Sequence, residues 1–595
     1  MSFLRNWRCL PIALVAIGTM VAFAACGGDD EGGGDGATTA PTDEPATGAR
    51  IDGGKLTVHA IEPQSLDPHF SSFAQDISFQ RFLWRGLYSL DADNKPQPAM
   101  ADGEPDISAD GLTFTVTLKS GLLWNDGDDL TSEDYVAGII RTCDPTNAGE
   151  YQYLLANIVG CDDYFNALAG ADGDPGTTDD NLAADSPEVA QLRDAVGVKA
   201  IDDTTIEFSL LNPGPTFQTI LSLWMTFPVP FHKIPDPATP WPAGPDAAGA
   251  LAFNGPYVLT DYVAGTSASF EPNPNFTAEQ SSVGEAPTLD ELELRFIDDH
   301  AVAVRAFESG ELDFALADLT QLESAVSKYE PTGQYYKLVR PSTRGLEMQL
   351  ETVPLDQLEV RLAIGRGIDW PAMIERCFGN GHEYTTSWIP EGIPAGKPTD
   401  EYIDVLGVDI EAAKQQLADA GFPNGEGMPE FRLVVRQGTE SECAGQFIQE
   451  ALRTNLNITA NIEALEGPVR SARFREETFD LFPGGWIQDY PDPENWVIGQ
   501  FDEPGVGLNH YNCDNQEIQD LVAEHEFNLD EDARIAGYER INEIISTEVC
   551  GMFVYYHEAE HYLKGETVVG MFENSTGQDA VSAGDWAAEA WGLSE

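Results

Sequence analysis

Cations and long apolar segments are both scarce in this sequence. It contains 32 Lys and Arg residues against 100 Asp and Glu residues, a formal net charge of −68. Nucleic-acid phosphates are bound by clustered cations, so this composition excludes a DNA- or RNA-binding role. We interpret the acidity as surface solvation suited to a saline environment, which would also favour cationic ligands.

The apolar run at residues 10–25 is shorter than the roughly 20 apolar residues that a membrane-spanning helix needs. It follows Arg5 and Arg8 and ends in small residues, which is the pattern of an export signal. We therefore expect residues 1–25 to be a signal peptide. The sequence F-A-A-C-G across this point resembles a bacterial lipobox with Cys26 as its lipid-modified residue. An ordinary signal peptide with an incidental cysteine is the alternative.

Large apolar side chains are absent from residues 27–50, which consist mostly of Gly, Asp, Glu, Thr, Pro and Ala. Such a segment buries too little surface to offset its ordering entropy, so residues 26–50 are predicted to be a flexible tether. The sequence thus predicts an extracytoplasmic body, anchored to the cell membrane by lipid only, on the periplasmic side or the outer face of the plasma membrane.

The sequence has no C-x-x-C spacing of a zinc or redox site. Of its 8 cysteines, Cys9 and Cys26 belong to the signal region, and an even number in an exported chain predicts disulfides. Cys143 and Cys161 are the favoured pair because they are close in sequence. Many pairings of the others are possible, so the connectivity stays open, and two pairs follow only by elimination: Cys377–Cys443 and Cys513–Cys550.

One motif suggests an enzyme. His557-Glu558-Ala559-Glu560-His561 satisfies H-E-x-x-H, which in zinc peptidases needs both histidines on one face of a helix. Here it follows Met552–Tyr556, a β-rich apolar run without a helix start, so we expect a strand. No G-x-S-x-G elbow and no Walker loop is present. We predict no enzyme activity, no cofactor and no metal, and keep an exported zinc peptidase as the alternative of another class.

Strand patterns alternate with helix patterns over several hundred residues. Leu112–Leu118 and Phe431–Arg436 have the apolar character of strands, whereas Ile77–Leu90 and Glu411–Ala420 have helical spacing. Thr131 and Asp134 form the sequence signature of a capping box at a helix start. The alternation predicts α/β lobes.

Many motifs occur in the order found in the family 5 extracytoplasmic solute-binding proteins, which serve peptide and nickel ABC importers. The resemblance spans nearly the whole mature chain and includes Ser65–His69 (S-L-D-P-H), Trp124–Tyr135 (W-N-D-G-D-D-L-T-S-E-D-Y), Asn254–Tyr257 (N-G-P-Y), Ser309–Asp313 (S-G-E-L-D) and Gly485–Tyr490 (G-W-I-Q-D-Y). It implies a two-lobed periplasmic-binding-protein-like α/β fold, with mixed sheets flanked by helices.

The resemblance also implies two chain crossings between the lobes, near Ile297 and Tyr556. Lobe I would contain residues 51–297 and 557–595, with an inserted subdomain at about 91–215. Lobe II would contain residues 298–556.

The candidate site lies in Gly484–Pro491 (G-G-W-I-Q-D-Y-P). Two glycines let the backbone bend or approach a ligand closely, Trp486 offers a flat apolar wall, and Asp489 offers a carboxylate. By residue type alone, a role for Asp489 in a turn before two prolines, Pro491 and Pro493, is favoured over ligand binding. The resemblance assigns it to the ligand, because the matching aspartate of oligopeptide-binding members holds the peptide's α-amino group.

Three further residues are assigned by the resemblance. Ser72 and Ala74 match a loop that lines the cleft, where contacts would be made by backbone as in an added strand. Tyr151 matches a tyrosine that touches the ligand, and a packed aromatic is the alternative.

These predictions combine into a monomeric, lipid-anchored substrate-binding protein of an ABC importer. It would bind short peptides between two lobes and deliver them to the permease and its ATPase complex. The alternative within this class is the same receptor for a metal chelate or an oligosaccharide.

Overall fold

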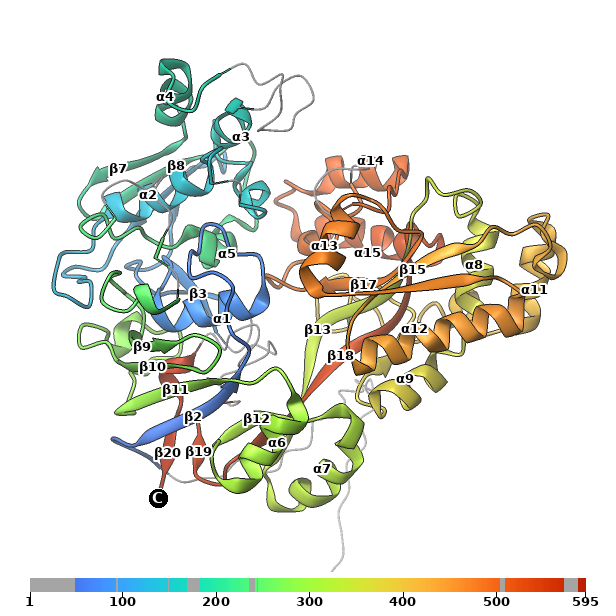
Figure 1. Cartoon of the computed structure of the whole chain (residues 1–595). Helices are drawn as coiled ribbons and strands as arrows, with labels where there is room; N and C mark the ends of the chain where they lie inside the picture. Colours follow the sequence, from blue (N-terminus) through green and yellow to red (C-terminus); the bar gives the residue numbers. More distant parts are fainter. Residues whose placement is uncertain are drawn as a thin grey trace, which may run out of the picture. The chain divides into compact units, whose positions relative to one another are not determined.

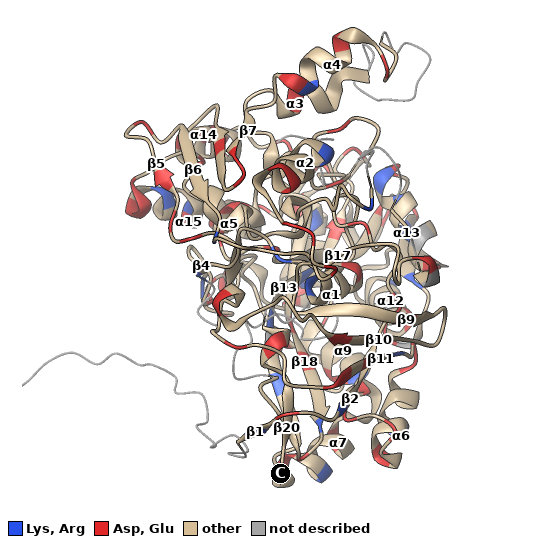
Figure 2. Ribbon diagram, turned by 90° about the vertical axis from the view of Figure 1, so that its left-hand side faces the viewer, with Lys and Arg blue, Asp and Glu red and all other residues tan. Residues whose placement is uncertain are grey.

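The computed structural model describes residues 49–91, 95–147, 149–168, 182–234, 241–242, 244–502, 509–571 and 587–595. The expected signal peptide, Cys26 and nearly all of the expected tether lie outside these residues. Within the described ranges, no helix combines the length and the apolar character that crossing a membrane requires. Figure 2 shows acidic residues on many helices and loops, with far fewer cations among them.

The main sheet has 11 strands and extends through both lobes (Figure 1). Its order is β16-β15-β17-β13-β18-β12-β2-β11-β10-β9, and β14 pairs with β18 beside this path. In chain order the strands are β2 (Lys55–Ala60), β9 (Tyr257–Val263), β10 (Ser267–Pro272), β11 (Glu291–Phe296), β12 (Phe314–Leu316), β13 (Tyr335–Met348), β14 (Glu383–Tyr384), β15 (Phe431–Arg436), β16 (Ala460–Leu465), β17 (Leu481–Ile487) and β18 (Met552–Lys564).

The two long strands β13 and β18 belong to both lobes. The beginning of β13 pairs with the end of β18, which also pairs with β12 of the first lobe. The end of β13 pairs with β17 of the second lobe. The pairing of β13 with β18 shifts register between Val339 and Thr343, where the two halves of the sheet meet.

The structure corrects the expected position of the first crossing. Residues after Ile297 stay in the first lobe, because α6 (His300–Ser309) leads to β12, which lies parallel to β2. The chain first passes to the second lobe in β13. The second passage lies in β18, which continues without interruption from Met552 to Lys564. Local patterns could not locate these passages, since the pairing partners are distant in sequence.

The first lobe contains α1 (Ala74–Leu83) against β9 and β10, where the ring of Phe79 contacts Phe270 with centroids 5.1 Å apart. The helix predicted over Ile77–Leu90 ends earlier, and β3 (Tyr88–Leu90) pairs with β4 (Pro96–Pro98). A small sheet pairs β1 (Arg50–Ile51), near the first described residue, with β20 (Gly592–Ser594) at the carboxyl end, and β20 also pairs with β19 (Val568–Val569). Also in this lobe are α5 (Phe217–Ile220) and α7 (Leu322–Tyr329).

A separate four-stranded sheet forms the core of the region inserted in the first lobe, with order β5-β6-β8-β7. Its α2 begins with the predicted capping box, in which Thr131 N donates to Asp134 Oδ2 at 2.8 Å. Figure 1 shows these elements together, coloured light blue to teal. They are β5 (Asp106–Ile107), β6 (Thr113–Thr117), α2 (Ser132–Thr142), α3 (Cys161–Phe165), α4 (Pro187–Asp194), β7 (Val198–Asp202) and β8 (Thr205–Ser209).

The second lobe surrounds its part of the sheet with helices over a separate apolar core. Aspartate N-caps begin several of them; Asp409 Oδ1, for example, accepts from Ala412 N at 2.9 Å. The helices are α8 (Leu358–Arg366), α9 (Trp370–Phe378), α10 (Ile403–Leu406), α11 (Ile410–Asp419), α12 (Thr439–Ala451), α13 (Gly467–Arg475), α14 (Gln516–His525) and α15 (Glu531–Thr547).

Three disulfides connect elements within single lobes: Cys143–Cys161, Cys377–Cys443 and Cys513–Cys550. Their Cα atoms are 5.2, 5.7 and 5.3 Å apart. Because each bond stays within one lobe, these bonds leave relative movement of the lobes unconstrained.

Candidate functional site

The S-L-D-P-H motif holds the loop that precedes Ser72 and Ala74. Arg141 of α2 donates to both carboxylate oxygens of Asp67, at 2.5 and 2.6 Å. Trp224 Nε1 donates to the carbonyl of Ser71 at 2.9 Å. This loop is therefore attached to the inserted region on one side and to α1 on the other.

The glycines of the G-G-W-I-Q-D-Y motif allow β17 to lie close against β13. A Cβ at Gly484 would be 2.2 Å from Glu347 Oε1, and a Cβ at Gly485 would be 2.1 Å from the carbonyl oxygen of Thr343. Gly485 also has a φ of 146°, which L side chains rarely adopt. The absent side chains thus make room for the neighbouring strand and for a buried carboxyl group.

Asp489 follows β17 and is held by uncharged partners from both lobes. Tyr151 donates its hydroxyl to Asp489 Oδ1 at 3.1 Å, and Asn495 Nδ2 donates to Oδ2 at 3.1 Å. The Asn495 Oδ1 atom accepts from Asp489 N at 2.8 Å and from Trp486 Nε1 at 3.1 Å. One asparagine therefore positions both the carboxylate and the indole of the motif.

Asp489 is only 9% exposed, which is unusual for a carboxyl group that lines a cleft. Burial raises the pKa of Asp489 to about 7, against the smaller opposing effects of Asn495, Tyr151 and the charge of Arg81. Burial also raises the pKa of Tyr151, and the neighbouring Asp489 adds to this effect. At neutral pH the carboxyl group is therefore close to its titration midpoint, and a cation beside it would favour the ionised form.

All five residues named from the sequence line one cavity of about 200 Å³: Ser72, Ala74, Tyr151, Trp486 and Asp489. The first three belong to the first lobe and the last two to the second. Their contact with a ligand stays a prediction. The cavity has both an apolar wall and a carboxylate, which suits an ammonium group carried on an organic molecule.

Arg344 of β13 connects this cavity with two others, of about 330 and 230 Å³, because it lines all three. Gly485 and Trp486 are shared between the Asp489 cavity and the 230 Å³ cavity. The three cavities together suit an extended ligand better than a compact one.

Sequence reasoning missed four residues at the Asp489 cavity: Arg81, Trp224, Arg344 and Asn495. Arg81 and Trp224 lie in elements that carry no site motif. Arg344 lies on β13, which shows no period-2 alternation. Asn495 follows the recognised motif by a few residues, and an amide after an aspartate is too common to signal a role.

The H-E-x-x-H motif is part of β18 and not of a helix. Residues four apart in a strand are separated by about 13 Å, so His557 and His561 cannot ligate one zinc ion together. His557 Nδ1 lies 2.8 Å from Thr343 Oγ1, and the His561 ring nitrogens face Tyr335 OH at 2.6 Å and the Gly381 carbonyl at 2.8 Å. The zinc-peptidase interpretation is therefore wrong on geometric grounds.

Glu558, the middle residue of that motif, is an ion-pair partner. Its carboxylate lies 2.9 Å from Arg344 Nε and 3.8 Å from Arg340 Nη1. Although burial opposes ionisation, the two arginines hold the pKa of Glu558 well below its ordinary value. The carboxylate is thus already neutralised by this chain.

A metal-ligating geometry occurs elsewhere among the described residues only at Asp126, Asp128 and His232. These side chains are near the surface, and Lys233 also pairs with Asp126 at 2.8 Å. An ammonium group in that position competes with a metal cation for the same carboxylate.

Two lobes joined by two long strands, with a lined cleft between them, define a solute-binding protein. The chain belongs to the bacterial extracellular solute-binding proteins, family 5, whose "Middle" model matches residues 95–507. The family description and the name of the curated relative OppA are those of binding proteins and not of enzymes.

Two curated relatives and one solved structure illustrate the similarity. The oligopeptide-binding protein OppA of Bacillus subtilis is 23% identical over 533 residues, covering 88% of this chain and 92% of the relative. The probable deoxycholate-binding periplasmic protein YgiS of Escherichia coli is 25% identical over 521 residues, covering 87% and 90%. The structure of the Escherichia coli murein tripeptide binding protein MppA superposes with a TM-score of 0.75 at 20% identity, covering 92% of this chain and 99% of that chain.

Proposed function

We propose that this protein is a lipid-anchored receptor that encloses short peptides between its lobes and delivers them to an ABC permease. The observation that carries the proposal is the buried Asp489 carboxyl group, whose side-chain hydrogen-bond donors among the described residues are all uncharged and which opens on a cavity shared by both lobes. The oligopeptide-binding and murein-tripeptide-binding relatives support a peptide ligand.

The α-ammonium group of the peptide would pair with Asp489, whose side-chain donors among the described residues, Tyr151 and Asn495, are both uncharged. Charge-assisted hydrogen bonds in a water-poor cavity are stronger than neutral ones, so this contact would anchor the amino end. Binding would lower the pKa of Asp489 and release its proton.

The rest of the peptide would extend past Trp486 towards Arg344, where the neighbouring cavities begin. Backbone contacts with the segment of Ser72 and Ala74 would resemble an added strand and would tolerate different side chains. A ligand that touches residues of both lobes favours the closed arrangement by the free energy of those additional contacts.

Membrane attachment and delivery complete the proposal. Residues 1–25 would direct export, Cys26 would carry the lipid, and residues 26–50 would tether a monomeric body to the extracytoplasmic face of the cell membrane. Energy for transport would come from the ATPase of the partner complex, since this sequence shows no nucleotide-site motif.

A second candidate ligand class is a non-peptide solute, because a relative of similar length is a probable deoxycholate-binding protein. The same cleft would then enclose a molecule other than a peptide, such as the metal chelate or oligosaccharide considered above. The two candidates differ in whether the ligand has a free amino group for Asp489.

Native mass spectrometry of the protein purified from its own host tests the proposal. We expect co-purified peptides with free amino termini. A sugar, a chelate or a steroid as the sole occupant would reject the peptide assignment and favour the second candidate. Calorimetry with alanine tetrapeptides, with and without an acetylated amino terminus, then measures the contribution of the ammonium group; equal affinity of the two forms would contradict it.

A further inference from the structure

The cavity of about 330 Å³ is lined on one side by aromatic rings, which come from Phe378 of α9, from His382 and from Tyr556 of β18. The His382 ring stacks on Tyr556, with ring centroids 4.4 Å apart and 17° between the planes. Phe378 packs against both rings, at 4.9 Å from His382 and 5.3 Å from Tyr556. Phe378 and Tyr556 are buried and His382 is half-buried. Together these three side chains form an aromatic wall.

His382 belongs to this wall as an uncharged ring. Its Nδ1 accepts a hydrogen bond from Ala559 N at 3.3 Å, so the ring proton lies on Nε2. Burial lowers the pKa of His382 to about 4, although the nearby charge of Glu558 acts against this change. At neutral pH the imidazole therefore packs as a neutral aromatic group.

The acidic side chains that line the cavity do not present a simple anionic site. Glu558 pairs with Arg344 at 2.9 Å, and Glu560 pairs with Arg340 at 2.8 Å. Burial raises the pKa of Glu440, at the start of α12, which disfavours its charged form. The aromatic wall, and not these carboxyl groups, is therefore the feature that distinguishes the cavity.

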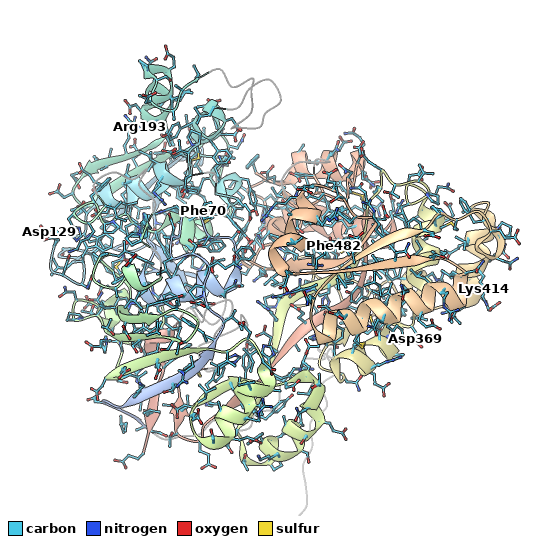
Figure 3. The ribbon with its side chains drawn as sticks, in the orientation of Figure 1. Phe70, Asp129, Arg193, Asp369, Lys414 and Phe482 are labelled. Atoms are coloured by element: carbon cyan, nitrogen blue, oxygen red, sulfur yellow. A yellow bond between two sulfur atoms is a disulfide. The ribbon has the colours of Figure 1, made fainter. Side chains whose placement is uncertain are left out.

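Arginine side chains face the same cavity: Arg344, Arg436 and Arg470. The guanidinium carbon of Arg470 lies 3.7 Å from the ring centroid of Phe482, which Figure 3 labels in the second lobe. The face of an aromatic ring attracts a cation, whereas an aliphatic side chain of equal size does not. An aromatic ring of the ligand would thus gain ring–ring contacts with the wall and contacts with guanidinium groups.

The position of the cavity indicates which part of a peptide would reach it. Asp489 lines the neighbouring cavity, and Gly484, five positions earlier in the chain, lines the cavity with the aromatic wall. Five residues of extended chain cover about 17 Å. A peptide whose amino group pairs with Asp489, and which runs along this segment, would place its third to fifth residue at the wall.

We propose that the 330 Å³ cavity is a subsite for an aromatic side chain at the third to fifth position of the bound peptide. Phe378, His382 and Tyr556 would determine this preference. The inference rests on the proposed peptide-binding function and specifies its substrate class: peptides with Phe, Tyr or Trp a few residues after a free amino terminus.

Calorimetry at pH 7 with matched pentapeptides tests the subsite. The series contains pentaalanine and its variants with Phe or cyclohexylalanine at position 3, 4 or 5. Cyclohexylalanine has nearly the size and the apolar character of Phe but lacks the π system. At one position we expect Phe to bind about tenfold or more tightly than Ala. At that position it should also bind about threefold or more tightly than cyclohexylalanine.

Variants of His382 test the wall itself. His382→Ala removes one ring, so the preference for Phe over cyclohexylalanine should fall to near equality, with the affinity for pentaalanine changed by less than about threefold. His382→Phe keeps a ring at this position and should retain the preference. The matched control is His510→Ala, which removes a half-buried histidine that packs on Phe474 at 4.9 Å and lines none of the three cavities. This control should also retain the preference.

NMR of a bound peptide with a carbon-13-labelled Phe gives a readout that does not depend on affinity. Ring currents of the aromatic wall should move the ring-proton resonances of the ligand upfield, and His382→Ala should reduce this shift. Unshifted resonances in the complex with wild-type protein contradict the stacking.

The outcomes separate the subsite from the proposed function. Equal affinity of wild-type protein for the Phe and cyclohexylalanine peptides at all three positions overturns the subsite, as does an undiminished preference in His382→Ala. Wild-type protein that binds pentaalanine without any aromatic preference rejects the subsite alone. Wild-type protein that binds none of the peptides rejects the proposed function as well.

Discussion

Asp489 and Glu558 are two largely buried carboxyl groups beside the same set of cavities, and their partners differ in charge. Glu558 faces Arg344 and Arg340, and its pKa is depressed. In the part of the chain that the structure describes, the Asp489 carboxylate accepts hydrogen bonds from the uncharged side chains of Tyr151 and Asn495, and its pKa is raised to about 7. Burial is common to both, so the charge of the partners decides whether a buried carboxyl group serves the fold or remains available to a ligand.

The comparison is also one between two sequence motifs. H-E-x-x-H is a well-known catalytic pattern, but here its central glutamate belongs to a strand and its charge is satisfied internally. The G-G-W-I-Q-D-Y motif has no such general meaning, yet it places a buried carboxyl group with a raised pKa at the cleft. A motif therefore predicts chemistry only when its secondary structure and its partners are also correct.

The largest expected effect is on stability. Replacing Glu558 by Gln removes the carboxylate that pairs with Arg344 and one of the two beside Arg340, which also pairs with Glu560 at 2.8 Å. We expect a loss of about 3 to 4 kcal/mol in the free energy of unfolding at pH 7. The depressed pKa means that this stabilisation is complete above pH 4.5, the ordinary value, and is lost as the pH falls through the folded-state pKa. Urea unfolding measures it, with Glu411→Gln at an exposed ion pair as the control. A loss no larger than that of the control would contradict the structural role.

Asp489→Asn should weaken ligand binding and leave the stability of the fold unreduced, in contrast to the stability loss expected for Glu558→Gln. It removes the anion that the proposal assigns to the peptide ammonium, so affinity should fall roughly hundredfold, about 3 kcal/mol. Stability should not decrease, because burial opposes ionisation of Asp489 and the side chains that donate to it among the described residues are uncharged. Calorimetry measures the affinity of this variant and urea unfolding measures its stability, with Asp110→Asn at an exposed turn as the control. Unchanged affinity would remove Asp489 from the site.

The third prediction concerns pH. Because the ligand-free pKa of Asp489 is about 7, peptide affinity should increase about tenfold per pH unit between pH 5.5 and 6.5 and level off above pH 7. Calorimetry in buffers with different ionisation enthalpies should also detect proton release near pH 6.5. Asp489→Asn should show neither effect; a pH dependence that survives this change would indicate another titrating group.

The smallest expected effect is that of Tyr151→Phe. It removes one hydrogen bond to Asp489, so peptide affinity should fall about fivefold, roughly 1 kcal/mol. Tyr164→Phe is a matched control, since its hydroxyl donates to Asp144 at 2.8 Å away from the cavities. Equal effects of the two changes would show that Tyr151 acts only through packing.

Local patterns predicted many elements because their causes are local. The alternation in Leu112–Leu118 became β6, and Thr131 and Asp134 form the capping box that begins α2. The end of α1 was misplaced, since apolar spacing continues through Leu87 although the chain turns into β3. β13 was not predicted at all, because a strand buried between two others has no period-2 pattern to detect.

The candidate site was predictable only in part. Trp486 and Asp489 stand next to each other in a motif, and the family resemblance supplied Ser72, Ala74 and Tyr151. Other residues of the site came from elsewhere: Asn495, which donates to Asp489, from a later turn, Arg81, whose charge lowers the pKa of Asp489, from α1, and the cavity-lining Arg344 from β13. Whether a buried carboxyl group is neutralised depends on atoms within a few ångströms, and sequence separation does not report that distance.

By itself the sequence determined the α/β class, most helix and strand positions and the family, since these follow from local periodicity, turn residues and ordered motifs. Only the tertiary structure decided where the chain passes between lobes, and that His557 and His561 lie apart on a strand. It also decided that, among the described residues, uncharged side chains donate to Asp489 whereas two arginines pair with Glu558. These properties depend on contacts between residues that are hundreds of positions apart, because only folding creates the low-dielectric surroundings and brings the opposite charges together.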